Sequence, residues 1–351
     1  MKKKFYTKIN NNFNSAFREK VINANSIVIT SHLSPDDDSI SSTLLIYFYL
    51  TKYLRIASGN IKLIITGEKS ERWEHFNGFD KIKFVDDLGK HLEEVEVLIM
   101  LDGSGWKRFI KSDKPRGFKG YTICIDHHPN PANKFDLHLL AENYVSTAEI
   151  IYKLFLKEER IDKDLAEIIF LGVWGDTGGL RFVNSNETSA FETIKRVVEI
   201  GNINIQTLTS KYMKIDFRLF NIISKLMSNT KIMNIKGWPP FQVASIDKDF
   251  INKGKYHENE VTEGYHIYID RYVRMLKGAD WGFVSVPKKD GYCYFSFRSL
   301  PGSVNVRLLA EDFAGGGGHD RASGAKLEEQ DVTKSLKSLY SWMSKNKPTL
   351  S

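Results

Sequence analysis

The sequence predicts an α/β protein of two domains: an N-terminal domain built on a parallel sheet and a smaller C-terminal α+β domain with a mixed sheet, with a cleft between them. Its length of 351 residues exceeds what one hydrophobic core usually covers. Its first 200 residues alternate apolar runs of strand length with helical patterns, which is typical of a parallel sheet covered on both faces. A second group of strand-like runs follows residue 236 without that alternation.

The strands of the first domain are expected at residues 26–32, 61–67, 95–102 and 121–128, where β-branched and apolar residues dominate. Helical patterns fall at 39–54, 147–158, 163–174 and 186–200. We place this domain at residues 1–200, followed by a polar helical linker at 201–236. The second domain, 237–351, is expected to have strands at 241–246, 265–272, 281–287 and 291–299, and a helix at 304–313.

The composition indicates an ordinary globular protein with a preference for anions. Charged residues make up 26% of the chain and the net charge is +7, which favours nucleotides or short nucleic acids as partners. The longest apolar run, 44–50, is too short to cross a bilayer, so no membrane association is expected. The 2 cysteines lack a metal-ligand spacing, and a reducing cytoplasm is the expected location.

Imidazole and carboxylate side chains follow three of the predicted strands. The candidates are His32, Asp36 and Asp38 after the first strand, Asp102 after the third, Asp126, His127 and His128 after the fourth, and Asp176 in a glycine-rich turn after the helix at 163–174. Each motif by itself is more typical of a solvated turn. The carboxyl ends of parallel strands meet at one edge, however, and adjacent acids repel unless a cation is bound. Together these residues predict a metal site.

The predicted ligands are nitrogen and hard oxygen without thiolate. This set favours Mn²⁺, with Mg²⁺, Co²⁺, Fe²⁺ or Zn²⁺ as alternatives. The ligands are more numerous than one open site needs, so we expect two ions about 3.5–4 Å apart that share a carboxylate, an arrangement suited to hydrolysis of phosphate esters.

A glycine run, 315–318, precedes His319 in the second domain. Such a run is usually a linker, but glycines also let backbone N–H groups approach a phosphate. A nearby arginine can bind phosphate through two hydrogen bonds, and the serine after it offers a hydroxyl. The predicted substrate-binding residues are Arg298, Ser299, Gly316, Gly317, Gly318 and His319.

The motifs HLSPDDD, the strand-terminal Asp102, CIDHHPN and WGDTGG, in this order, resemble those of the DHH phosphoesterases. The stretch 295–325 resembles the DHH-associated domain with its GGGH signature. The length of the chain and its lack of further modules resemble the stand-alone nano-RNase and pAp-phosphatase branch rather than the RecJ exonucleases.

The resemblance implies specific roles for the candidate residues. One metal would be held by His32, Asp36 and Asp102, and a second by Asp38, Asp102, His127 and Asp176. His128 would lie just outside the metal ligands, near the scissile phosphate, and Asp126 would orient the neighbouring imidazole. The chain departs from the family pattern at Asp37, where many members carry a small residue.

We therefore expect a Mn²⁺-dependent phosphodiesterase that hydrolyses very short oligoribonucleotides or dinucleotides to nucleoside monophosphates by a two-metal hydroxide mechanism, and that also removes the 3′-phosphate of pAp. The alternatives are a cyclic-di-AMP or pApA phosphodiesterase, a single-strand exonuclease and a non-catalytic nucleotide-binding protein. A homodimer is expected from the family resemblance, and no other protein partner is indicated.

Overall fold

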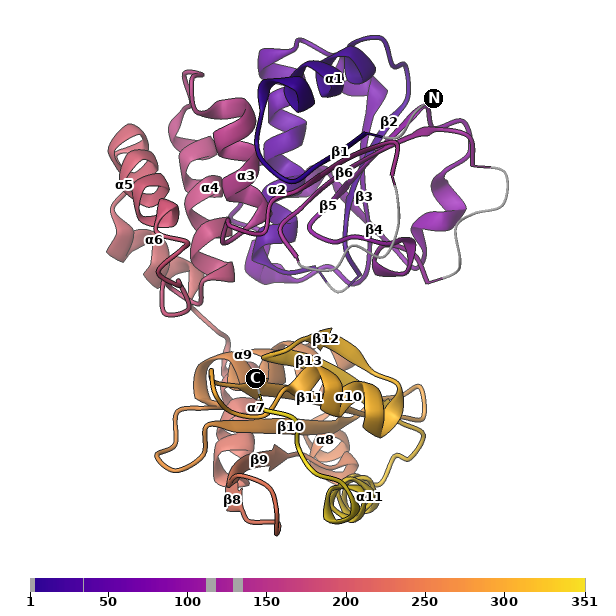
Figure 1. Ribbon diagram of the computed structural model, residues 1–351, viewed down its shortest axis with the longest axis vertical. Helices are drawn as coiled ribbons and strands as arrows, with labels where there is room; N and C mark the ends of the chain where they lie inside the picture. The colour runs from indigo at the N-terminus through magenta and orange to yellow at the C-terminus, as the bar shows by residue number, and fades with distance from the viewer. Residues whose placement is uncertain (1–3, 34, 112–117, 129–134, 351) are drawn as a thin grey trace. The chain divides into compact units, whose positions relative to one another are not determined.

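A computed structural model describes residues 4–33, 35–111, 118–128 and 135–350 (Figure 1). The chain forms two compact units, Met1–Met213 and Lys214–Ser351. The segment 201–236, expected as a linker, is divided between them: Leu208 belongs to the core of the first unit, and Ile222 to a core of the second. Among the described residues, no helix has the length and apolar character needed to span a membrane.

The first unit contains a seven-stranded sheet in the order β1-β7-β6-β5-β2-β3-β4, with every pair parallel. The strands are β1 (Lys4–Tyr6), β2 (Ile27–Ser31), β3 (Ile61–Thr66), β4 (Ile82–Val85), β5 (Val97–Leu101), β6 (Tyr121–Asp126) and β7 (Leu137–Leu140). The four strands expected from the sequence are confirmed as β2, β3, β5 and β6. The other three have only 3 or 4 residues each, too few to show a pattern.

Helices cover one face of this sheet (Figure 1). They are α1 (Asn11–Ile22), α2 (Asp37–Phe48), α3 (Thr147–Ile151) and α4 (Lys163–Asp176), and α2 and α3 continue into π-helical turns, Tyr49–Tyr53 and Tyr152–Leu156. Helix α5 (Ser189–Gly201) packs on α4 and is followed by α6 (Ile205–Tyr212). Helix α2 is buried on nearly all sides because it lies between the sheet and α4. Leu88, Trp106 and Phe109, from short turns, cover the other face. Leu88 belongs to the 3₁₀ helix Leu88–His91 and Trp106 to the 3₁₀ helix Trp106–Arg108, whereas Trp73 and Phe79, from the 3₁₀ helices Glu71–Trp73 and Phe79–Lys81, belong to the core on the helical face. A further 3₁₀ helix, Ser58–Asn60, precedes β3.

The strand order places a crevice between β2 and β5. From β2 the chain crosses to β3 on one side, and it later returns to β5 on the other side of β2. The connections after these two neighbouring strands therefore diverge. In open α/β sheets, ligands bind at this point, outside the carboxyl ends of the strands.

The second unit contains a six-stranded mixed sheet in the order β12-β13-β11-β10-β9-β8, in which only β9 and β10 pair in parallel. The strands are β8 (Lys231–Met233), β9 (Phe241–Ser245), β10 (Trp281–Pro287), β11 (Cys293–Ser299), β12 (Gly317–His319) and β13 (Ala322–Leu327). The helices are α7 (Phe217–Ser228), α8 (Lys248–Gly254), α9 (Glu258–Tyr272), α10 (Val306–Ala314) and α11 (Val332–Lys345). Helices α7 and α9 pack on one face of the sheet, and α10 and α11 on the other.

One local expectation for this unit is wrong. Residues 265–272 belong to helix α9, because the buried side chains Val261, Tyr265, Tyr268 and Ile269 recur at helical spacing. The glycine run 315–318, which follows the predicted helix, is also more ordered than a linker: Gly315 caps α10 with φ 61°, and Gly317 and Gly318 belong to the edge strand β12.

The contact between α2 and α4 predicts a stability defect. A Cβ added at Gly172 would lie 2.5 Å from Ser41 Oγ and 2.7 Å from Ala148 Cβ. Overpacking of this kind costs about 1–3 kcal/mol, so Gly172→Ala should lower the free energy of unfolding by that amount in urea denaturation. Gly59→Ala is the control, since nothing lies within 4 Å of its added Cβ. Equal stability of the two variants would contradict this packing.

Candidate metal centre

The acidic motif forms the start of helix α2. Asp36 is the N-cap, and its Oδ1 accepts a hydrogen bond from Ser39 N at 3.0 Å. Acidic side chains are favoured here because the helix N-terminus is the positive end of its dipole. The motif therefore begins the helix and, at the same time, brings carboxylates to the crevice beside β2.

Asp38 is held by the start of a second helix. Its Oδ2 accepts from Thr147 N at 2.7 Å, and its Oδ1 accepts from Ala148 N at 2.8 Å. These are the first residues of α3, so two otherwise unpaired N–H groups are satisfied by one carboxylate. Asp38 is 1% exposed and has little freedom to move.

Asp102 directly follows β5 and has φ 60°. This left-handed conformation is uncommon for a residue with a side chain, although aspartate tolerates it better than most. Ser39 Oγ donates a hydrogen bond to Asp102 Oδ2 at 2.9 Å, and Thr147 Oγ1 donates to Oδ1 at 3.4 Å. Asp102 thus lies between the first turns of α2 and α3, and it is 1% exposed.

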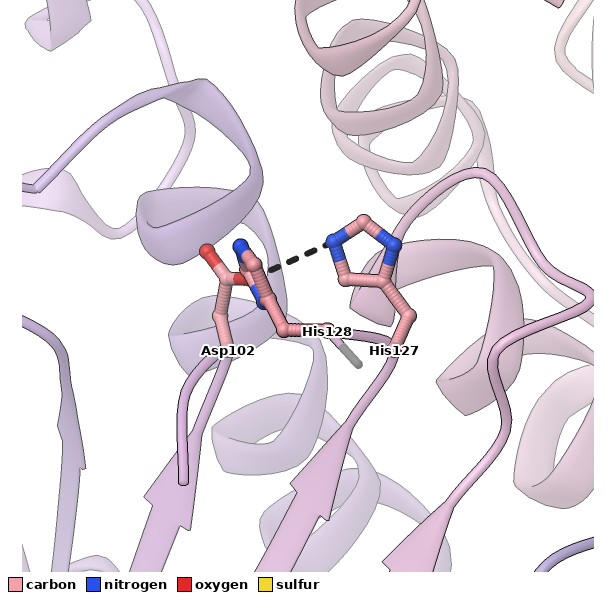
Figure 2. Close-up of side chains that lie close together, drawn as sticks. All are labelled: Asp102, His127 and His128. Atoms are coloured by element: carbon pink, nitrogen blue, oxygen red, sulfur yellow. Dashed lines mark ion pairs between the residues drawn. The ribbon is translucent and has the colours of Figure 1, made fainter. Parts of the chain in front are cut away.

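Two imidazoles point at these carboxylates. Nδ1 of His32 is 2.7 Å from Leu33 O, and Nδ1 of His127 is 3.2 Å from Tyr144 O. In the neutral ring each carbonyl keeps the proton on Nδ1 and leaves the Nε2 lone pair for a metal. Nε2 of His32 lies 3.3 Å from Asp102 Oδ2. Nε2 of His127 lies 3.6 Å from Asp102 Oδ1, the ion pair drawn as a dashed line in Figure 2.

These donors form overlapping groups with the spacing of metal ligands. The groups are His32, Asp36 and Asp102; Asp38, His127 and Asp176; and Asp102, His127 and His128, each with its ligand atoms within 4.8 Å of one another. Asp176 is the last residue of α4, and its Oδ2 lies 3.3 Å from His127 Nε2.

The donor set fits divalent cations. His127 Nε2 is buried without a hydrogen-bond partner in the described residues, although carboxylate oxygens face it on two sides. An orphaned ring nitrogen is costly unless something binds it. Nitrogen and carboxylate oxygen are the ligands that Mn²⁺, Mg²⁺ and Co²⁺ accept.

The electrostatics of the centre indicate excess negative charge. Burial raises the pKa of Asp38 well above its usual value, and the charge of Asp102 adds to this. Burial also raises the pKa of Asp102, but the hydrogen bond and charge of His32 outweigh it and hold that pKa well below its usual range. Burial lowers the pKa of His32, yet Asp36 and Asp102 raise it to about 10. A proton on His32 thus balances charge that a bound cation would balance instead.

His128 and Asp126 form a second pair beside Asp102. His128 Nδ1 donates to Asp126 Oδ1 at 2.8 Å, and Nδ1 is 3.5 Å from Asp102 Oδ1. Asp126 is fully buried at the end of β6. Figure 2 shows His128 lying against Asp102 while His127 points toward it from the side. Pro129 and Asn130 of the CIDHHPN motif lie outside the described residues.

The predicted substrate-binding residues lie in the second unit. Strand pairing aligns Arg298, Ala322 and His319 across β11, β13 and β12, so Arg298 and His319 project from the same face with a small residue between them. Arg298 donates from Nε at 3.1 Å and from Nη2 at 2.9 Å to Asp270 Oδ1. Ser299 projects to the opposite face, as the next residue in a strand must, and is 1% exposed.

The glycines of this motif differ in their surroundings. A Cβ at Gly316 would lie 2.2 Å from Gly324 O, and a Cβ at Gly318 would lie 2.5 Å from Ala322 O. Both positions therefore need glycine for close strand packing. Gly317 has nothing within 4 Å of its added Cβ, so open space lies above it on the face shared with His319.

Sequence analysis missed the residues that hold the ligands in place. Ser39 and Thr147 bond to Asp102, and Arg72 binds Asp37. The capping pattern predicts that Ser39 lies in the first turn of a helix, but not that its hydroxyl meets Asp102. For Arg72 the sequence carries no signal, because it lies 35 residues from its partner.

Comparison with known proteins agrees with these observations. The DHH family, N-terminal domain, matches residues 26–173, and the DHHA1 domain matches residues 256–345. The chain is 26% identical to the bifunctional oligoribonuclease and PAP phosphatase NrnA of Bacillus subtilis (strain 168) over 87% of this chain and 90% of that protein. It is 23% identical to the protein of the same name from Thermus thermophilus, over 87% of this chain and 85% of that one.

A solved structure has the same fold over nearly the whole chain. The exopolyphosphatase-related protein from Bacteroides fragilis superposes with a TM-score of 0.81 and 23% identity, covering 96% of this chain and 98% of that one. The fold, the clustered histidines and aspartates, and these matches define a phosphoesterase hydrolase. Within that class, the chain carries a DHH domain in its N-terminal part and a DHHA1 domain in its C-terminal part.

Asp102 belongs to two of the metal-ligand groups, so its charge should matter for ion binding. Removal of an outer-shell group typically costs a metal site 10–100-fold in affinity, so Asp102→Asn should weaken Mn²⁺ binding at least about 100-fold in isothermal titration. Asparagine preserves the left-handed backbone, which isolates the effect of charge. Asp80→Asn, at a side chain that is 81% exposed, is the control. Unchanged Mn²⁺ affinity in Asp102→Asn would contradict the assignment.

Proposed function

We propose that this protein is a Mn²⁺-dependent phosphodiesterase that hydrolyses dinucleotides and very short oligoribonucleotides to nucleoside monophosphates, and that it also removes the 3′-phosphate of pAp. The observation that carries the proposal is the pair of metal-ligand groups that meet at the carboxyl ends of β2 and β5. The names of the curated relatives, oligoribonuclease and PAP phosphatase, support this substrate class. Short RNA also agrees with the net charge of +7.

Each residue of the centre has a definite role in this proposal. His32, Asp36 and Asp102 would hold one ion, and Asp38, Asp102, His127 and Asp176 the other. Bound divalent ions would supply Lewis-acid chemistry, activating water near neutral pH and neutralising phosphate charge.

The buried Asp126 carboxylate accepts a hydrogen bond from Nδ1 of His128 and so fixes the orientation of that ring. His128 Nε2 can then donate to a phosphate oxygen as negative charge builds up in the transition state. His128 is thereby proposed as the residue that contacts the reacting phosphate, and Asp126 as the residue that orients it.

The second unit would bind the remainder of the substrate. Arg298 and His319 offer hydrogen-bond donors on the same face of the sheet, and the small side chain of Ala322 lies between them. Arg298 already binds a carboxylate oxygen, Asp270 Oδ1, through two N–H groups, and the same donors could bind a phosphate. A site with so few cationic contacts favours a short chain, because each phosphate of a long strand needs its own partner.

A turnover panel tests the substrate class. With Mn²⁺ present, 5′-labelled RNAs of two to 20 nucleotides are compared with pAp, pApA and cyclic di-AMP. We expect fast cleavage of the two- to five-mers and of pAp, with little action on the 20-mer. Processive digestion of the 20-mer would contradict the proposal in favour of an exonuclease, and preference for cyclic di-AMP in favour of a signalling enzyme. Nucleotide binding without turnover would contradict any catalytic role.

Substitutions should separate the roles of the two units. His128→Ala should lower kcat about 10²–10³-fold, the usual loss when one donor to transition-state charge is removed, with little change in KM. Arg298→Ala should mainly raise KM for dinucleotides, about tenfold or more, because a hydrogen bond to a charged group contributes about 1.5–3 kcal/mol. Arg218→Ala is the matched control, since Arg218 also pairs with an acid of α9, Glu260. Equal KM values in the two arginine variants would contradict the role of Arg298.

A further inference from the structure

Asp37, the middle one of three adjacent acids, makes contacts that differ from those of its neighbours. Asp36 and Asp38 each belong to a metal-ligand group, whereas Asp37 is bound by protein side chains. Its two carboxylate oxygens lie 2.6 and 2.7 Å from Arg72 Nη2, and its Oδ1 also accepts from Trp73 Nε1 at 2.8 Å. The Asp37 side chain is 10% exposed, so this ion pair is largely shielded from water.

Asp37 also contacts the helix end that carries another predicted ligand. A Cβ added at Gly175 would lie 2.4 Å from Asp37 Cβ, which means that the backbone of α4 packs directly on this side chain. The next residue of α4 is Asp176. A shift of Asp37 would therefore move the start of α2, the end of α4, or both.

Arg72 has a second partner in the same unit. Its Nη2 donates to Tyr212 OH at 2.7 Å, and its guanidinium lies 5.6 Å from the centre of that ring. The guanidinium also lies over Trp73, 5.5 Å from its ring centre. Arg72 is thus fixed by aromatic groups on two sides, and its side chain is only 28% exposed. A planar, delocalised cation suits such a position better than lysine does.

The charge of Arg72 matters because of what lies beside it. Without it, Asp37 would be a buried carboxylate next to Asp36 and Asp38, with no cation to compensate it. Removing Arg72 from this buried pair would therefore lower the stability of the fold, and the Asp37 carboxylate would tend to move toward water. The first turn of α2 would then change its conformation, and this turn carries the ligand carboxylates Asp36 and Asp38.

We propose that Arg72 is a positioning residue for the metal centre, holding Asp37 aside so that Asp36 and Asp38 keep their places beside Asp102 and Asp176. The inference rests on the proposed function only in that the centre binds divalent ions; it needs no particular substrate. It also gives a structural role to Asp37, the position at which this chain differs from the DHH pattern.

Mn²⁺ titration of the full chain, followed by the loss of the free-ion electron paramagnetic resonance signal, tests this role without any substrate. Arg72→Gln should bind Mn²⁺ about 10-fold more weakly, within the usual effect of residues that support metal ligands. Arg72→Lys, which keeps the charge, should lose less. Arg18→Gln is the matched control: Arg18 donates to Tyr49 OH at 2.8 Å and lies 5.7 Å from that ring centre. It pairs with no carboxylate among the described residues.

The double variant Asp37→Asn/Arg72→Gln separates positioning from general stability. It removes the Asp37 carboxylate together with the cation that pairs with it, so its Mn²⁺ affinity should return to within about threefold of wild type, a strongly non-additive result. It also keeps the test valid if Arg72→Gln alone does not fold. Wild-type affinity in Arg72→Gln, or no recovery in the double variant, would overturn the proposal.

The same titration distinguishes this inference from the proposed function. If the wild-type chain binds Mn²⁺ but cleaves no RNA, the function is wrong, and the comparison of variants still decides the role of Arg72. If the wild-type chain binds no Mn²⁺, both proposals are overturned.

Discussion

The first unit must hold several carboxylates close together at the ends of two neighbouring strands, β2 and β5, although these charges repel one another. Asp38 and Asp102 are each 1% exposed, so water contributes little to screening them. Backbone N–H groups of α3 bind the first of these, and the Ser39 hydroxyl binds the second. Unpaired buried charges cost several kcal/mol each, and these partners are what makes the arrangement tolerable before any ion is bound.

Two helix N-termini converge on this group of charges. Asp36 caps α2, and Asp38 accepts from the first residues of α3. Each helix contributes a positive dipole end, so the negative potential of the cluster is reduced by backbone as well as by side chains. Helix α2 follows β2, the strand at which the order of the sheet reverses, and α3 follows β7 on the β5 side of that point. The topology of the sheet and the electrostatics of the centre therefore depend on each other.

The sequence was most informative where a feature is local. Runs such as 97–101 are apolar throughout and could be identified as buried strands, and ligands that follow them share an edge of the sheet by geometry. The segment 265–272 was misassigned because its alternating aromatic and β-branched residues satisfy strand and helix patterns equally. Arg298 and Ser299 were expected to act together, but successive strand residues face opposite ways. The pairing of Arg72 with Asp37 depends on the folded chain, and no local pattern could have revealed it.

All of the predicted metal ligands fall between His32 and Asp176, within one unit, whereas Arg298 and His319 belong to the other. In the proposed function, ion binding and substrate binding would therefore rest partly on residues of different units. An enzyme built in this way can be charged with ions once and then serve many substrate molecules, so its working affinity for nucleotides can weaken or strengthen during evolution without loss of its metals. Such independence allows closely related chains to exchange one phosphate ester for another while the reactive centre is preserved.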